Sequence, residues 1–141
     1  MAHAVLGAGA WGSALACHLA QAGPVELWAR RPELIDEISR SRRTEHYLPG
    51  IDLPAALHLS QQFEATVAQV QANELIVLAT PVAGLAEAMR RLAALKADGM
   101  PVAPLVGVAK GLDAASGLLP HQLAESLLPG HPFAVLSGPS F

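Results

Sequence analysis

The chain has 141 residues, of which 52% are hydrophobic and 15% are charged, and this balance predicts one compact globular domain rather than a disordered segment. Its formal net charge of −3 gives no broad electrostatic reason to bind nucleic acid or an anionic membrane. The single cysteine, Cys17, excludes an intrachain disulfide framework and fits a small core position. With no secretory signal and no membrane-length apolar run in the sequence, these features predict a cytoplasmic protein.

The most informative motif follows the first apolar segment of the chain. Its residues read Gly-Ala-Gly-Ala-Trp-Gly, a G-x-G-x-x-G turn that precedes an Ala/Leu-rich stretch. In a strand–turn–helix context, Gly7 allows a tight turn, Gly9 lets a pyrophosphate approach the backbone, and Gly12 lets the helix pack on the strand. The alternative is a glycine-rich turn without a ligand. Trp11 is either a ring packed on neighbouring helices or a wall beside a cofactor.

The second apolar segment, residues 25–28, is followed directly by arginines. Arg30 and Arg31 come just after it, and the first carboxylate beyond it is Glu33. A carboxylate at this position would repel a 2′-phosphate, whereas arginines bind one through charge-assisted hydrogen bonds. The pattern therefore favours NADP(H) over NAD(H), with NAD(H) still possible. The alternative is two exposed arginines at the end of a strand.

Residues 39–54 interrupt the regular pattern. Charged residues, Pro49-Gly50 and Pro54 predict a loop or irregular excursion here. The arginines between positions 40 and 43 are interpreted as a solvated helix face and loop.

Strands and helices alternate through the rest of the chain. Strands are predicted at 3–6, 25–28, 57–59, 75–79, 105–109 and 133–136, and helices at 13–22, from Pro32, and at 61–72, 82–95 and 118–128. This alternation with short connections predicts an α/β fold, a Rossmann-type doubly wound and mostly parallel sheet with helices on both faces. We expect residues 1–141 to form one dinucleotide-binding domain.

A lysine follows one of the predicted buried strands. Lys110 comes after the strand at 105–109 and precedes Gly111, at the edge where parallel sheets bind ligands. Its ammonium group can neutralise a phosphate or polarise a carbonyl, although a lysine on a loop is otherwise usually solvated. The six histidines show no metal-ligand spacing, so no metal site is predicted.

Five motifs occur together in a specific order along the whole chain: Gly7–Gly12, Leu27–Arg31, Tyr47–Gly50, Val108–Leu112 and Ser137–Phe141. Each motif alone is weak, but in this order the chain closely resembles the N-terminal half of bacterial NAD(P)-dependent sn-glycerol-3-phosphate dehydrogenases. The resemblance implies hydride transfer between dihydroxyacetone phosphate and sn-glycerol 3-phosphate, in phospholipid synthesis. It also implies a small-molecule substrate and a possible homodimer.

The resemblance assigns roles to individual residues. It implies that the cofactor is bound by Gly7, Gly9, Ala10, Trp11, Gly12, Arg30, Arg31, Tyr47 and Lys110, and the substrate by Lys110, Gly138 and Ser140. The family usually has serine where this chain has Ala10, so a hydroxyl contact is missing. Lys110 is the candidate catalytic residue.

The family's chain continues into a helical C-terminal domain, which holds the proton-transferring lysine and most ligands of the substrate phosphate. That domain is not part of this sequence, so we expect the chain to bind cofactor and to show essentially no turnover. Two alternatives remain open. One is the N-terminal domain of another two-domain NADP-dependent reductase, of the ketopantoate or 6-phosphogluconate type, and the other is a non-catalytic nucleotide-sensing module.

Overall fold

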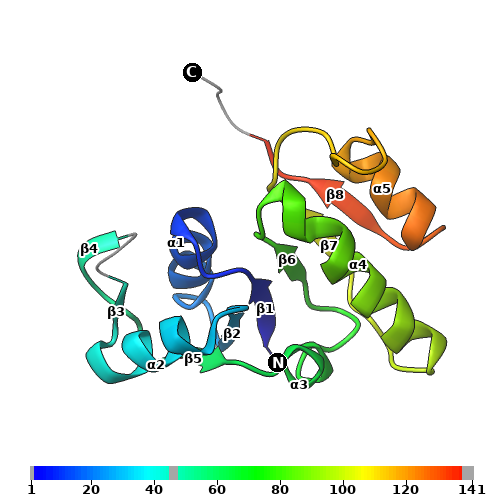
Figure 1. Ribbon diagram of the computed structural model, residues 1–141. Helices are drawn as coiled ribbons and strands as arrows, with labels where there is room; N and C mark the ends of the chain where they lie inside the picture. Colours follow the sequence, from blue (N-terminus) through cyan, green and yellow to red (C-terminus); the bar gives the residue numbers. More distant parts are fainter. Residues whose placement is uncertain (1, 45–47, 138–141) are drawn as a thin grey trace.

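A computed structural model describes residues 2–44 and 48–137, and six of the strands in these residues form one parallel sheet (Figure 1). They are β1 (His3–Leu6), β2 (Val25–Trp28), β5 (Leu57–Ser60), β6 (Ile76–Leu78), β7 (Leu105–Gly107) and β8 (Phe133–Val135). The strand order is β5-β2-β1-β6-β7-β8, and every neighbouring pair is parallel. The chain therefore winds outward from β1 and then from β6, which places a topological switch point between these two strands.

Helices cover both faces of this sheet. They are α1 (Ala10–Leu19), α2 (Pro32–Ser41), α3 (Phe63–Ala68), α4 (Val82–Ala97) and α5 (Pro120–Leu127). Figure 1 shows α1 and α2 on one side and α4 and α5 on the other. Alternate residues of the central strands bury into two separate clusters: Val5 and Val77 pack with α1 and α2, whereas Leu6 and Leu78 pack with α3, α4 and α5. The predicted doubly wound fold is confirmed.

The predicted apolar stripes form the core. On α4, Leu85, Met89 and Leu92 are fully buried, at the i, i+4, i+7 spacing of one helix face. Cys17 on α1 is half-buried against the α1/α2 cluster, and burial raises the pKa of its thiol.

The prediction of an irregular excursion over residues 39–54 was wrong in part. Helix α2 continues to Ser41, and β3 (Arg43–Thr44) then pairs antiparallel with β4 (Leu48–Asp52) in a separate two-stranded sheet. Pro49 is compatible with β4 because an edge strand tolerates a residue without an N–H donor.

Arg42 is not a solvated surface arginine. It ends α2 in a left-handed conformation with φ of 54°, and its guanidinium Nη2 donates hydrogen bonds to Pro54 O at 2.6 Å and Leu57 O at 3.1 Å. These hydrogen bonds satisfy the backbone carbonyls of Pro54, which precedes β5, and of Leu57, the first residue of β5. The interpretation of this arginine as part of a solvated face is therefore corrected.

Helix α1 begins three residues earlier than predicted. Its first residue is Ala10, and Ser13 N–H donates to Gly9 O at 2.9 Å, so the first turn includes Trp11 and Gly12.

No helix among the described residues is long and apolar enough to cross a membrane.

Candidate functional site

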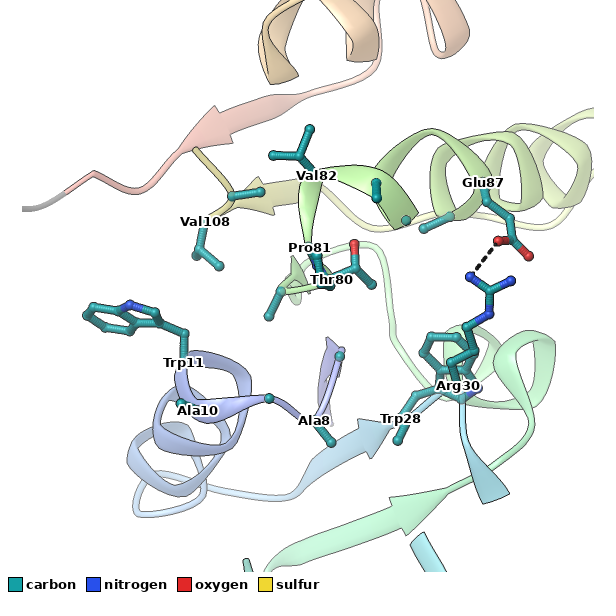
Figure 2. Close-up of a pocket in the computed structure, with 18 of the residues that line it drawn as sticks. Ala8, Ala10, Trp11, Trp28, Arg30, Thr80, Pro81, Val82, Glu87 and Val108 are labelled. Atoms are coloured by element: carbon teal, nitrogen blue, oxygen red, sulfur yellow. Dashed lines mark ion pairs between the residues drawn. The ribbon is translucent and has the colours of Figure 1, made fainter. Parts of the chain in front are cut away.

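A large cleft opens along the carboxyl ends of the central strands. Its volume is about 1220 Å³, and it is lined by the glycine-rich turn, the segments after β2, β6 and β7, and one side of α4. Figure 2 shows Arg30 and Glu87 at one end and Trp11 and Val108 at the other, with Ala8 between them. Pockets for drug-sized ligands are typically ~300–1,000 Å³, so this cleft has room for a longer molecule.

Gly7 lies where the glycine-rich turn packs closely against the end of β6. Its φ is +123°, and a Cβ there would lie 2.6 Å from Ala79 O and 2.8 Å from Thr80 N. Both the backbone conformation and the close approach therefore require glycine at this position.

Gly12 and Gly9 differ in what surrounds them. A Cβ on Gly12 would collide with Gly7 O, so glycine there lets α1 pack against the turn. A Cβ on Gly9 would meet nothing within 4 Å, and the φ of Gly9 is an ordinary −76°. Gly9 also lines the cleft. The fold does not need glycine at this position, whereas a phosphate that approaches the backbone would.

The first N–H groups of α1 face the part of the cleft that Gly9 lines. Gly9 is the N-cap, and the first turn has neither a side-chain cap nor an acidic residue. Ser13 Oγ is buried and donates to Ala8 O at 3.3 Å, which holds the turn against the helix start. Uncapped N–H groups and the helix dipole make this end of the helix suitable for an anion.

Trp11 lies on the rim of the cleft. Its side chain is 70% exposed, and Figure 2 shows the ring directed outward on the same side as Val108. Within the described residues the ring therefore does not pack on neighbouring helices, contrary to that alternative. A rim position is compatible with a wall beside a bound molecule.

Arg30 and Arg31 both line the cleft at the end of β2. Arg30 Nη1 lies 3.1 Å from Glu87 Oε2 of α4, and the two side chains are 71% and 51% exposed. Arg31 is the N-cap residue of α2, with an exposed side chain. A carboxylate thus lies beside Arg30, although none follows β2 directly in the sequence.

Sequence reasoning missed Glu87. A signal for it exists on α4, where Gly84, Glu87, Ala88 and Arg91 all line the cleft. Their i, i+3, i+4, i+7 spacing is that of one helix face, adjacent to the buried apolar stripe. A face that carries glycine, alanine and charges at this spacing is a candidate for contact with a ligand.

Aromatic and charged side chains form the wall of the cleft near the end that Arg30 and Arg31 line. Trp28 is 7% exposed, and its ring meets Phe63 edge-on with centroids 5.1 Å apart. The guanidinium of Arg91 lies 4.1 Å from the Phe63 centroid and donates from Nε and Nη2 to Glu64 Oε1, at 3.0 and 2.7 Å. The hydrogen bond from Arg91 lowers the pKa of Glu64.

Lys110 lines the cleft from the loop after β7, where its side chain is exposed. The loop beyond it is closed by Asp113, whose N–H donates to Leu118 O at 2.9 Å. The Asp113 carboxylate accepts hydrogen bonds from Ser116 N and Oγ at 3.0 and 2.7 Å, and these bonds lower the pKa of Asp113. Sequence reasoning missed this residue, for which the Asp-x-x-Ser spacing is the signal.

Three candidate residues, Tyr47, Gly138 and Ser140, lie outside the described residues. Ser137, which precedes Gly138 in the sequence, lines the cleft. Within residues 2–44 and 48–137, no group of three or more His, Cys, Asp or Glu side chains is placed to hold a metal ion.

Comparison with known proteins gives consistent matches. A family model described as NAD-dependent glycerol-3-phosphate dehydrogenase N-terminus matches residues 3–141. The chain is 44% identical over 138 residues to the glycerol-3-phosphate dehydrogenase [NAD(P)+] of Methylibium petroleiphilum, and 45% identical over 138 residues to that of Thiobacillus denitrificans. Each alignment covers 97% of this chain but 40% of the relative.

A solved structure shows the same arrangement. The crystal structure of glycerol-3-phosphate dehydrogenase from Coxiella burnetii superposes with a TM-score of 0.82 at 31% sequence identity. The match covers 99% of this chain and 41% of that chain.

Proposed function

This chain belongs to the family of NAD-dependent glycerol-3-phosphate dehydrogenase N-termini, and we propose that its cleft binds a nicotinamide dinucleotide. The bound cofactor would serve the reduction of dihydroxyacetone phosphate to sn-glycerol 3-phosphate and the reverse reaction. The observation that carries the proposal is Gly9, which lines the cleft with open space where a Cβ would stand. A pyrophosphate close to the backbone explains glycine at this position, and nothing in the fold requires it.

The residues of the cleft fit such a molecule along its length. The turn from Gly7 to Trp11 and the uncapped start of α1 would hold the pyrophosphate. Arg30 and Arg31 would hold the adenosine end, and Lys110 would lie at the other end, near the substrate. When bound, the nicotinamide supplies the hydride.

We propose NADP(H) as the preferred cofactor, with NAD(H) accepted. Two arginines line the end of the cleft that follows β2, where a cofactor of this fold places its adenosine ribose. Guanidinium groups bind a phosphate dianion by charge-assisted hydrogen bonds, and NAD(H) has no phosphate at that position.

Lys110 is proposed to act on the substrate. Its ammonium would stabilise negative charge that develops on the carbonyl oxygen during hydride transfer, and it would attract the substrate phosphate. Asp113 would act as a positioning residue, because its bonds to Ser116 fix the loop that carries Lys110.

The chain alone is proposed to bind cofactor without turnover. It spans about 40% of the length of the relatives it matches. Hydride transfer also needs a fixed substrate carbonyl and a proton donor, and we propose that the part of the relatives beyond the aligned region supplies both. A cytoplasmic location and a homodimer of the complete enzyme belong to the same proposal.

The test is to mix the purified chain with NADPH and dihydroxyacetone phosphate and to follow NADPH absorbance, with cofactor binding followed by fluorescence in parallel. We expect bound NADPH and a rate no higher than that without protein. Substantial turnover by the chain alone would show that the proton donor lies within these residues. Membership of this family argues against a reductase of the ketopantoate or 6-phosphogluconate type.

A further inference from the structure

The ion pair between Arg30 and Glu87 spans the arginine end of the cleft. Arg30 follows β2 on one wall, Glu87 belongs to the second turn of α4 on the other, and their charged atoms are 3.1 Å apart (Figure 2). Both residues line the cleft, and both side chains are more than half exposed. The pair is therefore accessible to a ligand and can separate at small energetic cost.

Glu87 pairs with Arg30 across the cleft and not with Arg91 of its own helix. Arg91 is four residues further along α4, a spacing at which glutamate and arginine commonly pair. However, both Nε and Nη2 of Arg91 bond to Glu64, and its guanidinium stacks on Phe63. Arg91 is therefore engaged with Glu64, and the ion pair of the Glu87 carboxylate is with Arg30.

The Arg30–Glu87 pair affects a ligand with a 2′-phosphate differently from one with free ribose hydroxyls. A 2′-phosphate that binds Arg30 must either displace the Glu87 carboxylate from Nη1 or bind beside its negative charge, and both cost binding energy. A ribose with free hydroxyls carries no such charge and can donate hydrogen bonds to a carboxylate. Glu87 would therefore weaken the binding of NADP(H) and not that of NAD(H).

We propose that Glu87 is a specificity-determining residue, which holds Arg30 by an ion pair and so limits the preference for NADP(H) over NAD(H). This inference rests on the proposed function, because it assigns the adenosine ribose to this end of the cleft. It explains how one site accepts both cofactors: Arg30 binds the phosphate when one is present, and Glu87 accepts from the ribose hydroxyls when none is.

The test compares ligands that differ only at the 2′ position, by calorimetry on the 141-residue chain. NADPH is paired with NADH, and 2′,5′-ADP with ADP. The variants are Glu87→Gln, which keeps the size of the side chain, and Glu125→Gln, an exposed glutamate on α5 with the same change in net charge. Thermal melts verify that both variants fold.

Glu87→Gln is expected to tighten NADPH and 2′,5′-ADP by about threefold to tenfold, the range expected for an exposed charge pair and its repulsion. NADH and ADP should not tighten, and Glu125→Gln should change none of the four. The gain should be smaller when Arg30 is also replaced by alanine, because the part of it that comes from the ion pair with Arg30 is then absent.

Two outcomes would overturn the inference while the proposed function stands: equal changes for the ligands with and without a 2′-phosphate, or a gain that persists undiminished without Arg30. Failure of the unsubstituted chain to bind either NADPH or NADH would instead contradict the proposed function itself.

Discussion

At the scale of single residues, Gly9 separates a ligand requirement from a folding requirement. Nothing lies within 4 Å of a Cβ at this position, so Gly9→Ala should leave the thermal melting temperature nearly unchanged. If a pyrophosphate rests against this backbone, the added methyl group should weaken cofactor binding by at least about tenfold, since it occupies the space of the ligand. Fluorescence titration with NADPH measures the effect.

Gly23→Ala is the matched control, because its Cβ also meets nothing within 4 Å but the residue does not line the cleft. It should bind cofactor normally. Normal cofactor binding by Gly9→Ala would mean that the turn is only structural.

The arginine pair predicts a change in selectivity. Replacement of both Arg30 and Arg31 by alanine should weaken NADPH binding, with each lost charge-assisted bond worth about 1.5–3 kcal/mol, while NADH binding changes much less. Parallel calorimetric titrations give the ratio. Arg40→Ala, an exposed arginine of α2 outside the cleft, serves as control. Equal losses for both cofactors would refute the phosphate role.

Lys110 predicts a split between binding and catalysis. In a chimera that continues residues 1–141 with the remaining part of the Thiobacillus denitrificans relative, Lys110→Met should lower kcat/KM by about two orders of magnitude, as loss of a transition-state donor typically does. Cofactor affinity should fall far less, because the turn and the arginines remain. A Lys110→Met chimera as active as its parent would show that the chemistry is placed wrongly.

At the scale of elements, the ion pair between Glu64 of α3 and Arg91 of α4 depends on the ionised form of Glu64. The hydrogen bond from Arg91 lowers the pKa of Glu64 below its unfolded value. Its contribution to stability is therefore present above the unfolded pKa, about 4.3, and is lost as the pH falls through the folded pKa. Glu64→Gln should reduce stability near neutral pH by less than ~1 kcal/mol, since the pair is exposed, and should make no difference in strong acid.

Thermal melts of both proteins near pH 7 and below pH 3 check this prediction. An equal deficit of Glu64→Gln at both pH values would exclude the ion pair as its cause.

Elements defined by periodicity were predicted well, and those defined by distant partners were not. The apolar stripe of Leu85, Met89 and Leu92 is visible in the sequence because burial repeats at helical spacing. The hairpin of β3 and β4 contains Pro49 and Gly50, whose local signal is that of a loop. Arg42 reads as a surface charge because its acceptors, the carbonyls of Pro54 and Leu57, are set by tertiary structure.

At the scale of the whole molecule, the alternation of strands and helices was enough to predict the parallel sheet and the edge along which the cleft lies. The same alternation could not show that α4 brings Glu87 within 3.1 Å of Arg30. Charge balance in the cleft is a property of the assembled fold, since its two walls come from segments far apart in the chain. The arginines after β2 were therefore identified, and the counter-ion of Arg30 was not.

Calorimetric titration of the 141-residue chain with NADPH and with NADH in parallel tests directly the claim that this cleft binds a nicotinamide dinucleotide. We predict one binding site per chain for each cofactor, with NADPH the tighter ligand, and binding of both weakened by at least about tenfold in Gly9→Ala. Absence of binding by the unsubstituted chain to either cofactor, at concentrations where it is folded, would contradict the claim.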